Sequence, residues 1–275
     1  MKNITTASFT MFLFYGTMHP AYAEDNLPDK FKIALGGYTL VRSDTTMSLT
    51  EPNTGAGISI DPRDTLGIET EKTVARLEGY YRFNEQHALT YSWYAISSDG
   101  TKTLADEINW VDENGDNITI PIGASVKASM DYDIFKLGYL WSFYHNDKIE
   151  LSAGAGLHVT RVAIGIDTAT TSSGIDAKKV STTVPLPVLS FGLTYHVTPK
   201  YSWYLKSEAF YLEFEDWTGS YTDSMLGMEY RVWERLGLGV ALASNALKVT
   251  EDTSDYEFTY GNRISGAFMY AAAYF

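Results

Sequence analysis

The side chains that could do chemistry are few in this chain of 275 residues. It has no cysteine, which excludes a disulfide framework, a thiolate zinc site, an iron–sulfur cluster and a cysteine nucleophile. One of the five histidines, His19, lies close to the N-terminus. Three others, His87, His145 and His196, lie beside predicted tight turns. Only His158 falls in the middle of a predicted strand, so it is the one histidine placed for a role inside the fold.

Two acidic stretches invite a cation-binding interpretation. Asp131 and Asp133 alternate near the end of a predicted strand, so their carboxylates share one face. Such pairs are more often solvated, or loosely bound to divalent cations, than catalytic. Residues 112–117 (DENGDN) lack the glycine at the sixth position and the closing glutamate of an EF-hand calcium loop. We therefore assign no catalytic residue and no metal site, and the sequence contains no cofactor motif.

Charge and composition exclude two further classes. The chain has 21 Lys+Arg against 34 Asp+Glu, a formal charge of -13. Nucleic-acid binders need basic surfaces that release counterions from phosphate, so neither DNA nor RNA is expected as a partner. With 45% hydrophobic and 14% aromatic residues, the chain can bury a large surface and is not expected to be disordered.

The N-terminal segment has the organisation of a secretory signal peptide. Lys2 precedes an apolar centre at 9–15 (FTMFLFY), and 21–23 (AYA) forms a small-x-small cleavage signature. The apolar run is too short and too interrupted for a spanning helix, which needs about 20 residues. We expect residues 1–23 to be a cleaved signal peptide and 24–275 to form one domain.

Beyond residue 23, apolar side chains recur with period two. In 133–143 the aromatic residues share one face, while small or charged residues share the other, and 149–159 alternates as clearly. A helix would mix these sets, so both segments are predicted strands. The same pattern predicts ten strands, near 31–49, 72–83, 87–98, 125–144, 148–166, 180–197, 200–215, 221–234, 236–249 and 256–275.

The links between these strands alternate in length. Tight links are expected at 84–86, 145–147, 198–199 and 235. The other set includes long polar stretches at 50–71, 99–124 and 167–179, and two shorter ones near 216–220 and 250–255. Short turns on one side and longer loops on the other are typical of bacterial outer-membrane barrels, with the turns in the periplasm. The predicted fold is therefore all-β, a closed antiparallel transmembrane barrel of about 10 strands, within a range of 8–12. The alternative is a soluble sandwich or lipocalin-like barrel whose aromatic residues form the core.

Aromatic residues gather near the predicted turns, as an interfacial belt at a membrane surface requires. The predicted belt consists of Trp141, Trp203, Trp233, Phe83, Phe143, Tyr195 and Tyr201. A soluble barrel has no reason to place tryptophan in a ring there.

Two hairpins and the C-terminus carry a family resemblance. Residues 79–89 (GYYRFNEQHAL), 141–151 (WSFYHNDKIEL) and the terminal Phe275 resemble small proteobacterial outer-membrane β-barrels of the outer-membrane protein A-like kind. The resemblance implies the outer membrane of a Gram-negative bacterium, with membrane lipid and lipopolysaccharide as surroundings. It also implies insertion by the barrel-assembly machinery, which reads a C-terminal phenylalanine. The superfamily includes adhesins, plugs, channels and enzymes, so it implies no single activity.

The last strand departs from the family's usual form. Ala273 stands where a second aromatic residue is expected, while Phe268, Tyr270 and Tyr274 fall on the opposite face. Which face of this strand meets lipid is therefore left open.

If the aromatic faces meet lipid, the opposite faces place charged residues in the lumen. The predicted lumenal network consists of Arg76, Glu78, Arg82, Lys136, Glu150, His158, Lys206, Glu208, Glu229 and Arg231. An isolated charge would be costly in so narrow an interior, so the mixture of signs predicts ion pairs that plug the barrel. The alternative is a narrow ion or small-solute channel whose paired charges set its selectivity.

An outer-membrane hydrolase is a third interpretation. His158 and Thr160 resemble the His-x-Ser pair of lipid A deacylases, in which histidine is the general base and serine the nucleophile. Asp131 and Asp133 are the nearest match to the acidic pair of omptin-type proteases, which also use ten strands. No histidine falls in a predicted extracellular loop, as such a protease would require.

One long loop is predicted to project as a β-ribbon. Residues 107–111 and 117–122 alternate on either side of Asn114-Gly115, the preferred centre of a type I′ hairpin. Trp110 would then be exposed, which is uncommon without a partner. The sequence thus favours a non-enzymatic surface or structural protein with a plugged lumen, whose loops could adhere to an unknown extracellular partner.

Overall fold

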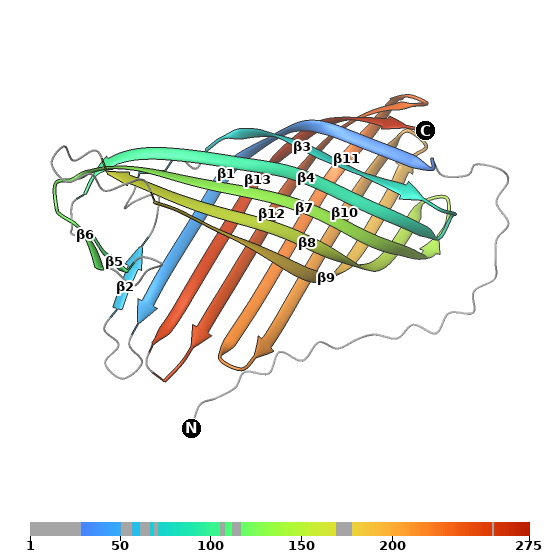
Figure 1. The fold of residues 1–275 in the computed structure, drawn as a ribbon. Coiled ribbons are helices and arrows are strands. Elements are labelled where there is room, and N and C mark those ends of the chain that lie inside the picture. The colour runs from blue at the N-terminus through green and yellow to red at the C-terminus, as the bar shows by residue number, and fades with distance from the viewer. Residues whose placement is uncertain are drawn as a thin grey trace.

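The computed structural model describes residues 29–50, 57–60, 67–68, 71–104, 108–111, 117–168, 178–254 and 256–275. Long antiparallel strands form one sheet, which closes where its last strand pairs with its first (Figure 1). The ten barrel strands are β1 (Phe31–Thr50), β3 (Thr73–Arg82), β4 (His87–Thr103), β7 (Ser125–His145), β8 (Ile149–Thr168), β9 (Lys178–Thr198), β10 (Tyr201–Phe214), β11 (Trp217–Trp233), β12 (Leu236–Asp252) and β13 (Glu257–Tyr274). The predicted fold class is confirmed. No helix in the described ranges is long and apolar enough to cross a membrane.

Three short strands lie outside the barrel wall. β2 (Gly57–Ile60) pairs with the end of β1, while β5 (Ile108–Val111) and β6 (Asn117–Ile120) pair with each other as a separate ribbon. This ribbon lies where the alternation predicts one. Asn114, Gly115 and the side chain of Trp110 lie outside the described part of the structure, as does the predicted signal peptide, 1–23.

Alternation along each strand separates an inner from an outer face. In β7, Ile134 and Lys136 are buried, whereas Phe135 and Leu137 are exposed on the outside. In β13, Phe268, Tyr270 and Tyr274 are the buried residues, and Phe275 beyond the strand is 65% exposed. The face that carries Ala273 and Phe275 is thus the outer face, which resolves the orientation that the sequence leaves open.

Side-chain caps build the short turns, which lie at the same end of the barrel as Phe31 and Phe275. This is called the turn end below, and the opposite end the loop end. Asn84 Oδ1 accepts hydrogen bonds from the backbone N–H groups of Gln86 and His87, both at 2.9 Å. Asn146 and Thr198 cap the next two turns in the same way. These Asx and Ser/Thr turns explain why so few residues suffice to reverse the chain.

The predicted loop at 216–220 is wrong. The structure instead reverses the chain at Glu215 and Asp216, and β11 begins at Trp217. Glu215 has a φ of 52°, the left-handed conformation that such a turn requires. Polar residues and Gly219 suggest a loop in the sequence, but Phe214 and Trp217 are cross-strand partners that continue the alternation. The link predicted at 250–255 is also shorter, because β12 runs to Asp252.

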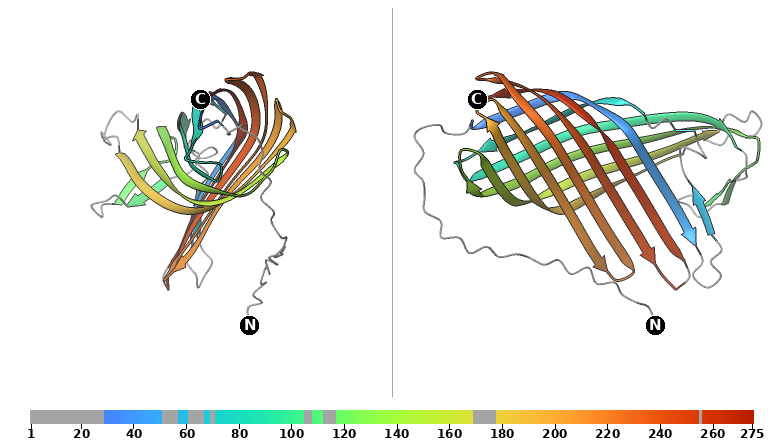
Figure 2. Two further views of the ribbon diagram at one scale, coloured as in Figure 1. Left: turned by 90° about the vertical axis from the view of Figure 1, so that its right-hand side faces the viewer. Right: turned by 180° about the vertical axis from the view of Figure 1, so that it is seen from behind.

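The β9–β10 seam of the barrel is paired over only part of its length, and the β1–β3 pairing likewise ends at Thr39 and Thr73. β9 and β10 pair from the turn end as far as Leu189 and Ala209, and no pairing continues beyond that point. Towards the loop end, the wall from β3 to β9 curves away from the wall formed by β10–β13 and β1 (Figure 2). Every other neighbouring pair between β7 and β13 keeps its ladder to the loop end.

Candidate functional site

Near the turn end, Glu229 of β11 is the centre of a buried cluster. Lys32 Nζ of β1 lies 2.6 Å from its carboxylate, and the side chains of both residues are at most 14% exposed. The Tyr270 hydroxyl donates to Glu229 at 2.9 Å, and the Tyr274 hydroxyl also contacts the carboxylate. Tyr204 lies 3.0 Å from the Tyr270 hydroxyl and extends the cluster across the lumen. One lysine and two tyrosines thus satisfy a carboxylate that would otherwise be costly to bury.

Glycines on neighbouring strands make room for these rings. Tyr270 lies across Gly239 of β12, and Tyr204 across Gly227 of β11, each on its cross-strand partner. A Cβ atom at Gly239 would lie 2.2 Å from a carbon of the Tyr270 ring, and one at Gly227 would lie 2.4 Å from the Tyr204 ring. Both positions therefore exclude any side chain while the tyrosines keep their places.

Gly239→Ala is expected to lower the free energy of unfolding by about 1–3 kcal/mol, the usual cost of overpacking. The new methyl group displaces the Tyr270 ring and with it one hydrogen bond to Glu229. Urea unfolding of the barrel in detergent, followed by tryptophan fluorescence, measures the change. Gly219→Ala is the matched control, because its Cβ would lie at an ordinary 3.7 Å from Phe210. Equal stability of the two variants would contradict the role of Gly239.

At the middle of the barrel, Arg76 and Glu78 form a buried pair. Arg76 Nη2 lies 3.3 Å from Glu78 Oε2, and Lys206 Nζ reaches Glu78 Oε1 at 3.0 Å from the opposite wall. Lys206 itself is half exposed, whereas Arg76 and Glu78 are almost fully buried. The carboxylate of Glu78 is therefore shared by two cations.

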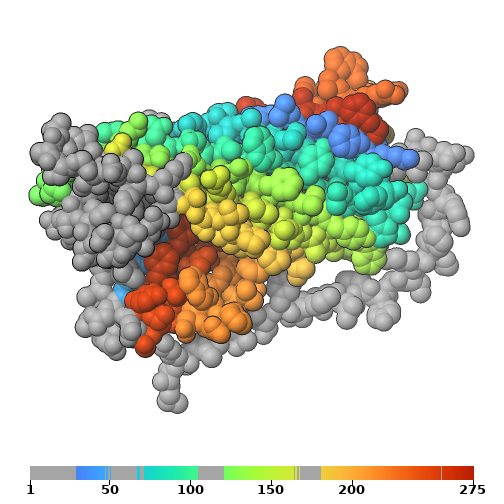
Figure 3. Space-filling model, in the orientation of Figure 1, coloured from blue at the N-terminus to red at the C-terminus, as the bar shows by residue number. Residues whose placement is uncertain are grey.

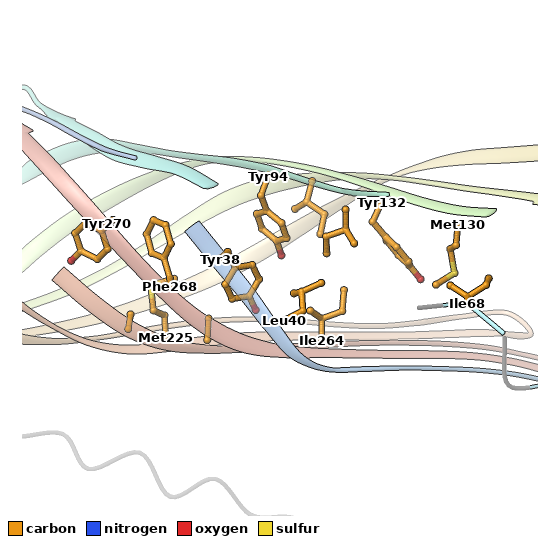
Figure 4. Packing of buried hydrophobic residues seen from close by; sticks show 14 of the residues in the cluster. Tyr38, Leu40, Ile68, Tyr94, Met130, Tyr132, Met225, Ile264, Phe268 and Tyr270 are labelled. Atoms are coloured by element: carbon orange, nitrogen blue, oxygen red, sulfur yellow. The ribbon is translucent and has the colours of Figure 1, made fainter. Parts of the chain in front are cut away.

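Aromatic rings surround the Arg76 guanidinium group. Its central carbon lies 5.3, 5.0 and 5.3 Å from the ring centroids of Tyr38, Tyr94 and Phe268, respectively. Tyr94 projects from one wall towards Tyr38 on the opposite wall, and their rings meet edge to face at 5.6 Å (Figure 4). These three rings are at most 1% exposed. Cations on aromatic faces contribute about 2 kcal/mol or more when they are desolvated, so these rings stabilise the buried charge of Arg76.

Towards the loop end, Lys136 and His158 share Glu208. Lys136 Nζ lies 2.7 Å from Asp223 and 3.1 Å from Glu208, while His158 Nε2 lies 3.1 Å from Glu208. The Tyr221 ring meets the imidazole edge to face at 5.1 Å. His158 is 1% exposed, and its Nδ1 has no hydrogen-bond partner among the described residues.

Two further pairs lie near the turns. Arg82 Nη2 lies 2.9 and 2.8 Å from the two carboxylate oxygens of Glu150, and Ser142 also contacts that carboxylate. Arg231 contacts Asp29, just before β1 begins. Ion pairs thus occur from the turn end to the layer of His158.

Of the ten predicted lumenal residues, some pair with each other and some pair with residues outside the predicted set. The structure brings together Arg82 with Glu150, Arg76 and Lys206 with Glu78, and Lys136 and His158 with Glu208. Glu229 and Arg231 instead bind residues that the sequence reasoning missed, which are Lys32 and Asp29. Asp223 and the tyrosines Tyr204, Tyr221, Tyr270 and Tyr274 were missed as well. The period-two pattern alone could have identified Lys32 and Asp223, because each lies an even number of positions from the buried residues of its strand and so shares their face.

The seven residues of the predicted aromatic belt lie on the outer face near the turn end. Trp141, Trp203, Trp233, Phe83 and Tyr195 are exposed, whereas Phe143 and Tyr201 are partly buried. Trp141 and Phe143 contact each other, as do Tyr201 and Trp203.

The two hydrolase candidates are not assembled into catalytic sites. Asp133 accepts a hydrogen bond from Trp93 Nε1 at 2.9 Å on the outer face, and Asp131 accepts one from Ser97 at 2.5 Å. The sheet itself separates both carboxylates from His158, which faces inward. Thr160 is buried on the same inner face as His158, but Nε2 of the imidazole is directed to Glu208. In the ranges that the structure describes, no group of three or more His, Asp or Glu side chains is arranged to hold a metal ion.

Comparison with known proteins places the fold. No protein family matches the chain, and no curated protein matches it. The crystal structure of the outer-membrane protease OmpT from Escherichia coli is similar, with a TM-score of 0.56 and 12% identity over 90% of this chain and 97% of that chain. The attachment invasion locus protein Ail of Yersinia pestis gives a TM-score of 0.32 at 10% identity, over 87% of this chain and 97% of that one. The transport unit of the autotransporter AIDA-I from Escherichia coli gives 0.38 at 9% identity, over 93% of each chain. The chain has the fold of a small outer-membrane β-barrel.

Proposed function

We propose that this chain is an exported protein of the Gram-negative outer membrane whose barrel is sealed, and which acts at the cell surface without passing solutes or catalysing a reaction. The observation that supports it most directly is the filled layer around Arg76. There the guanidinium group and the rings of Tyr38 and Phe268 are each at most 3% exposed. A continuous water path would have to displace these side chains and separate their ion pairs.

The membrane setting is supported by the outer face. Leu226, Leu242 and Met269 are 49%, 66% and 63% exposed there, and the aromatic belt lies nearer to the turn end. Soluble monomers rarely expose continuous apolar surface of this extent, whereas a lipid-facing band requires it. The proposal includes export with cleavage after residue 23, assembly machinery that reads Phe275, and contact with membrane lipid and lipopolysaccharide.

The paired charges support a structural role for the lumen. Breaking a buried ion pair by removing one partner leaves an uncompensated charge, so such pairs resist the rearrangement that a gate would need. The non-enzymatic part of the proposal is supported by Glu208, whose carboxylate lies 3.1 Å from Nε2 of the buried His158 and occupies that nitrogen. The predicted ribbon around Trp110 remains the segment proposed to meet an extracellular partner.

The protein reconstituted in planar bilayers at high salt is expected to give no stable conductance steps. In a sealed barrel, the layer around Arg76 blocks the path of hydrated ions. Folding is checked beforehand by its circular dichroism and by its shifted migration in unheated gels. Reproducible steps from folded protein would contradict the sealed lumen and favour the narrow channel instead.

A further inference from the structure

The β9–β10 seam is open towards the loop end. From Leu189 to Lys178, β9 pairs with β8 alone, and from Ala209 to Phe214, β10 continues its ladder with β11 alone. In the space-filling view, red side chains of β12 and β13 are visible in a hollow between the yellow β9 and the orange β10 and β11 (Figure 3). The wall of the barrel therefore has a lateral slot at this seam.

Two prolines explain where the seam parts. Continuing the register beyond Leu189 and Ala209 would set Pro187 opposite Tyr211 and Pro185 opposite Glu213. Both prolines pair with residues of β8. Because proline has no N–H group, it fits in this pairing only at a position that makes no backbone hydrogen bond to β8. The N–H groups that they lack would consequently have pointed at β10. Two successive donors are missing from that edge of β9, so the ladder ends there.

The slot lies in the outer part of the apolar band. Leu189 is six positions from Tyr195 along the outer face of β9, and Ala209 is six positions from Trp203 along β10. Tyr195 and Trp203 belong to the aromatic belt, and a transmembrane strand needs about 9–11 residues to cross the bilayer. Beyond these six positions the slot opens towards lipid of the outer leaflet.

Apolar side chains line both sides of the slot. On the inner face, Leu186 and Val188 of β9 are buried with Tyr221, and Phe210 of β10 packs against them. Leu212 continues this face along β10 and is 53% exposed. Phe214, one step further, is 62% exposed. Among the described residues, an apolar surface is thus left without a partner at the point where the wall separates.

The floor of the slot is polar. The layer of Lys136, His158 and Glu208 lies directly beneath the apolar lining, since His158 is the cross-strand partner of Leu186. The buried Nδ1 of His158 has no hydrogen-bond partner among the described residues. Further towards the turn end the layer of Arg76 fills the barrel, so an apolar molecule can enter the slot from the membrane but not from the periplasm.

We propose that the slot between β9 and β10 receives an acyl chain of an outer-leaflet lipid, which enters sideways from the membrane. Exposed leucine and phenylalanine side chains are chemically suited to contact a hydrocarbon chain. Leu189, at the turn-end edge of the slot, is 73% exposed and connects the slot with the lipid-facing band. A second copy of this chain fits less well, because Pro185 and Pro187 deprive the β9 edge of the donors that strand addition would use. Lipid entry rests on the proposed location in the membrane, and it does not depend on whether the lumen conducts ions.

The test uses phosphatidylcholine vesicles whose lipid carries a diazirine near the end of one acyl chain. The full-length chain is expressed, purified from the outer membrane and reconstituted, and the adducts are mapped by mass spectrometry after irradiation. Adducts are expected on 184–188 and 210–214 as well as on the outer face around Phe191 and Leu205. Adducts on the outer face alone would overturn lipid entry. Adducts at neither place would instead overturn the proposed membrane setting.

A variant that closes the seam gives the matched comparison. Pro185→Val with Pro187→Val restores two N–H donors, so the ladder should extend and the adducts on 210–214 should fall several-fold, while those on Leu205 stay constant. Pro199→Ala, in the turn between β9 and β10, is the control and should change neither. Undiminished labelling of 210–214 in a folded double variant would overturn the assignment of the seam as the entry route.

A spin label keeps the proposal testable if the double variant fails to fold. The chain has no cysteine, so Leu212→Cys carries the only label, at a position that is already half exposed. Power saturation is expected to show greater contact of the nitroxide with lipid-soluble oxygen than with a water-soluble nickel complex. The reverse ratio would mean a water-filled slot, and oxidation to a disulfide-linked dimer would mean a second copy at the seam. Either result would overturn lipid entry.

Discussion

Glu229→Leu is expected to lower the free energy of unfolding by about 3–5 kcal/mol, the usual cost of removing one partner from a buried ion pair. The substitution leaves Lys32 charged and buried without its only described carboxylate partner, and it removes the acceptor of two tyrosine hydroxyls. Urea unfolding in detergent, followed by tryptophan fluorescence and checked by refolding, measures the loss.

Two variants separate the charge from the loss of packing. Lys32→Met combined with Glu229→Leu removes both charges, so it should recover part of the stability that the single change loses. Asp147→Asn, which removes a carboxylate from an exposed turn, should stay within about 0.5 kcal/mol of the unchanged protein. If Glu229→Leu alone also fell within that range, the cluster around Glu229 would not stabilise the barrel.

Period two carried most of the fold because a barrel wall has only two faces. For β7, the alternation of Phe135 and Lys136 orients the residues as far as Ser142, beyond which a register shift before Tyr144 interrupts it. The loop at 216–220 failed for a local reason, since composition does not reveal the left-handed turn at Glu215. Strand prediction is therefore most reliable where the residues on the inner and outer faces of a strand differ most in polarity.

The partners inside the lumen depend on a quantity that alternation does not contain. Lys32 and Glu229 are 197 positions apart, and they meet because of the stagger at which β13 closes on β1. That stagger sets which inward residues share a layer. The register shift between Leu40 and Arg42 of β1 alters it locally. The sequence thus indicates which charges face inward, but it does not indicate which of them pair.

The parted seam shows the same limit for backbone pairing. Pro185 and Pro187 are visible in the sequence, and the period-two pattern runs through them without interruption. Their effect depends on which neighbouring strand each missing N–H would have faced, and this follows only from the register with β8.

Tyr38→Ala combined with Phe268→Ala is expected to convert a silent barrel into one that gives resolvable conductance steps. Both rings are at most 1% exposed and lie on the guanidinium group of Arg76. Removing them opens the layer that is proposed to seal the lumen, and the uncovered charge attracts water into the gap. Planar-bilayer recording at high salt makes the comparison, with circular dichroism to show that the strands are retained.

The control replaces an aromatic residue of similar size on the other face. Tyr139→Ala removes a ring that is 45% exposed on the outside, so it should leave the barrel silent. Silence from the folded double variant would mean that the seal does not lie at Arg76. The cluster of Lys32, Glu229 and Tyr270 would then be the layer to open next, because it also buries paired charges inside the barrel.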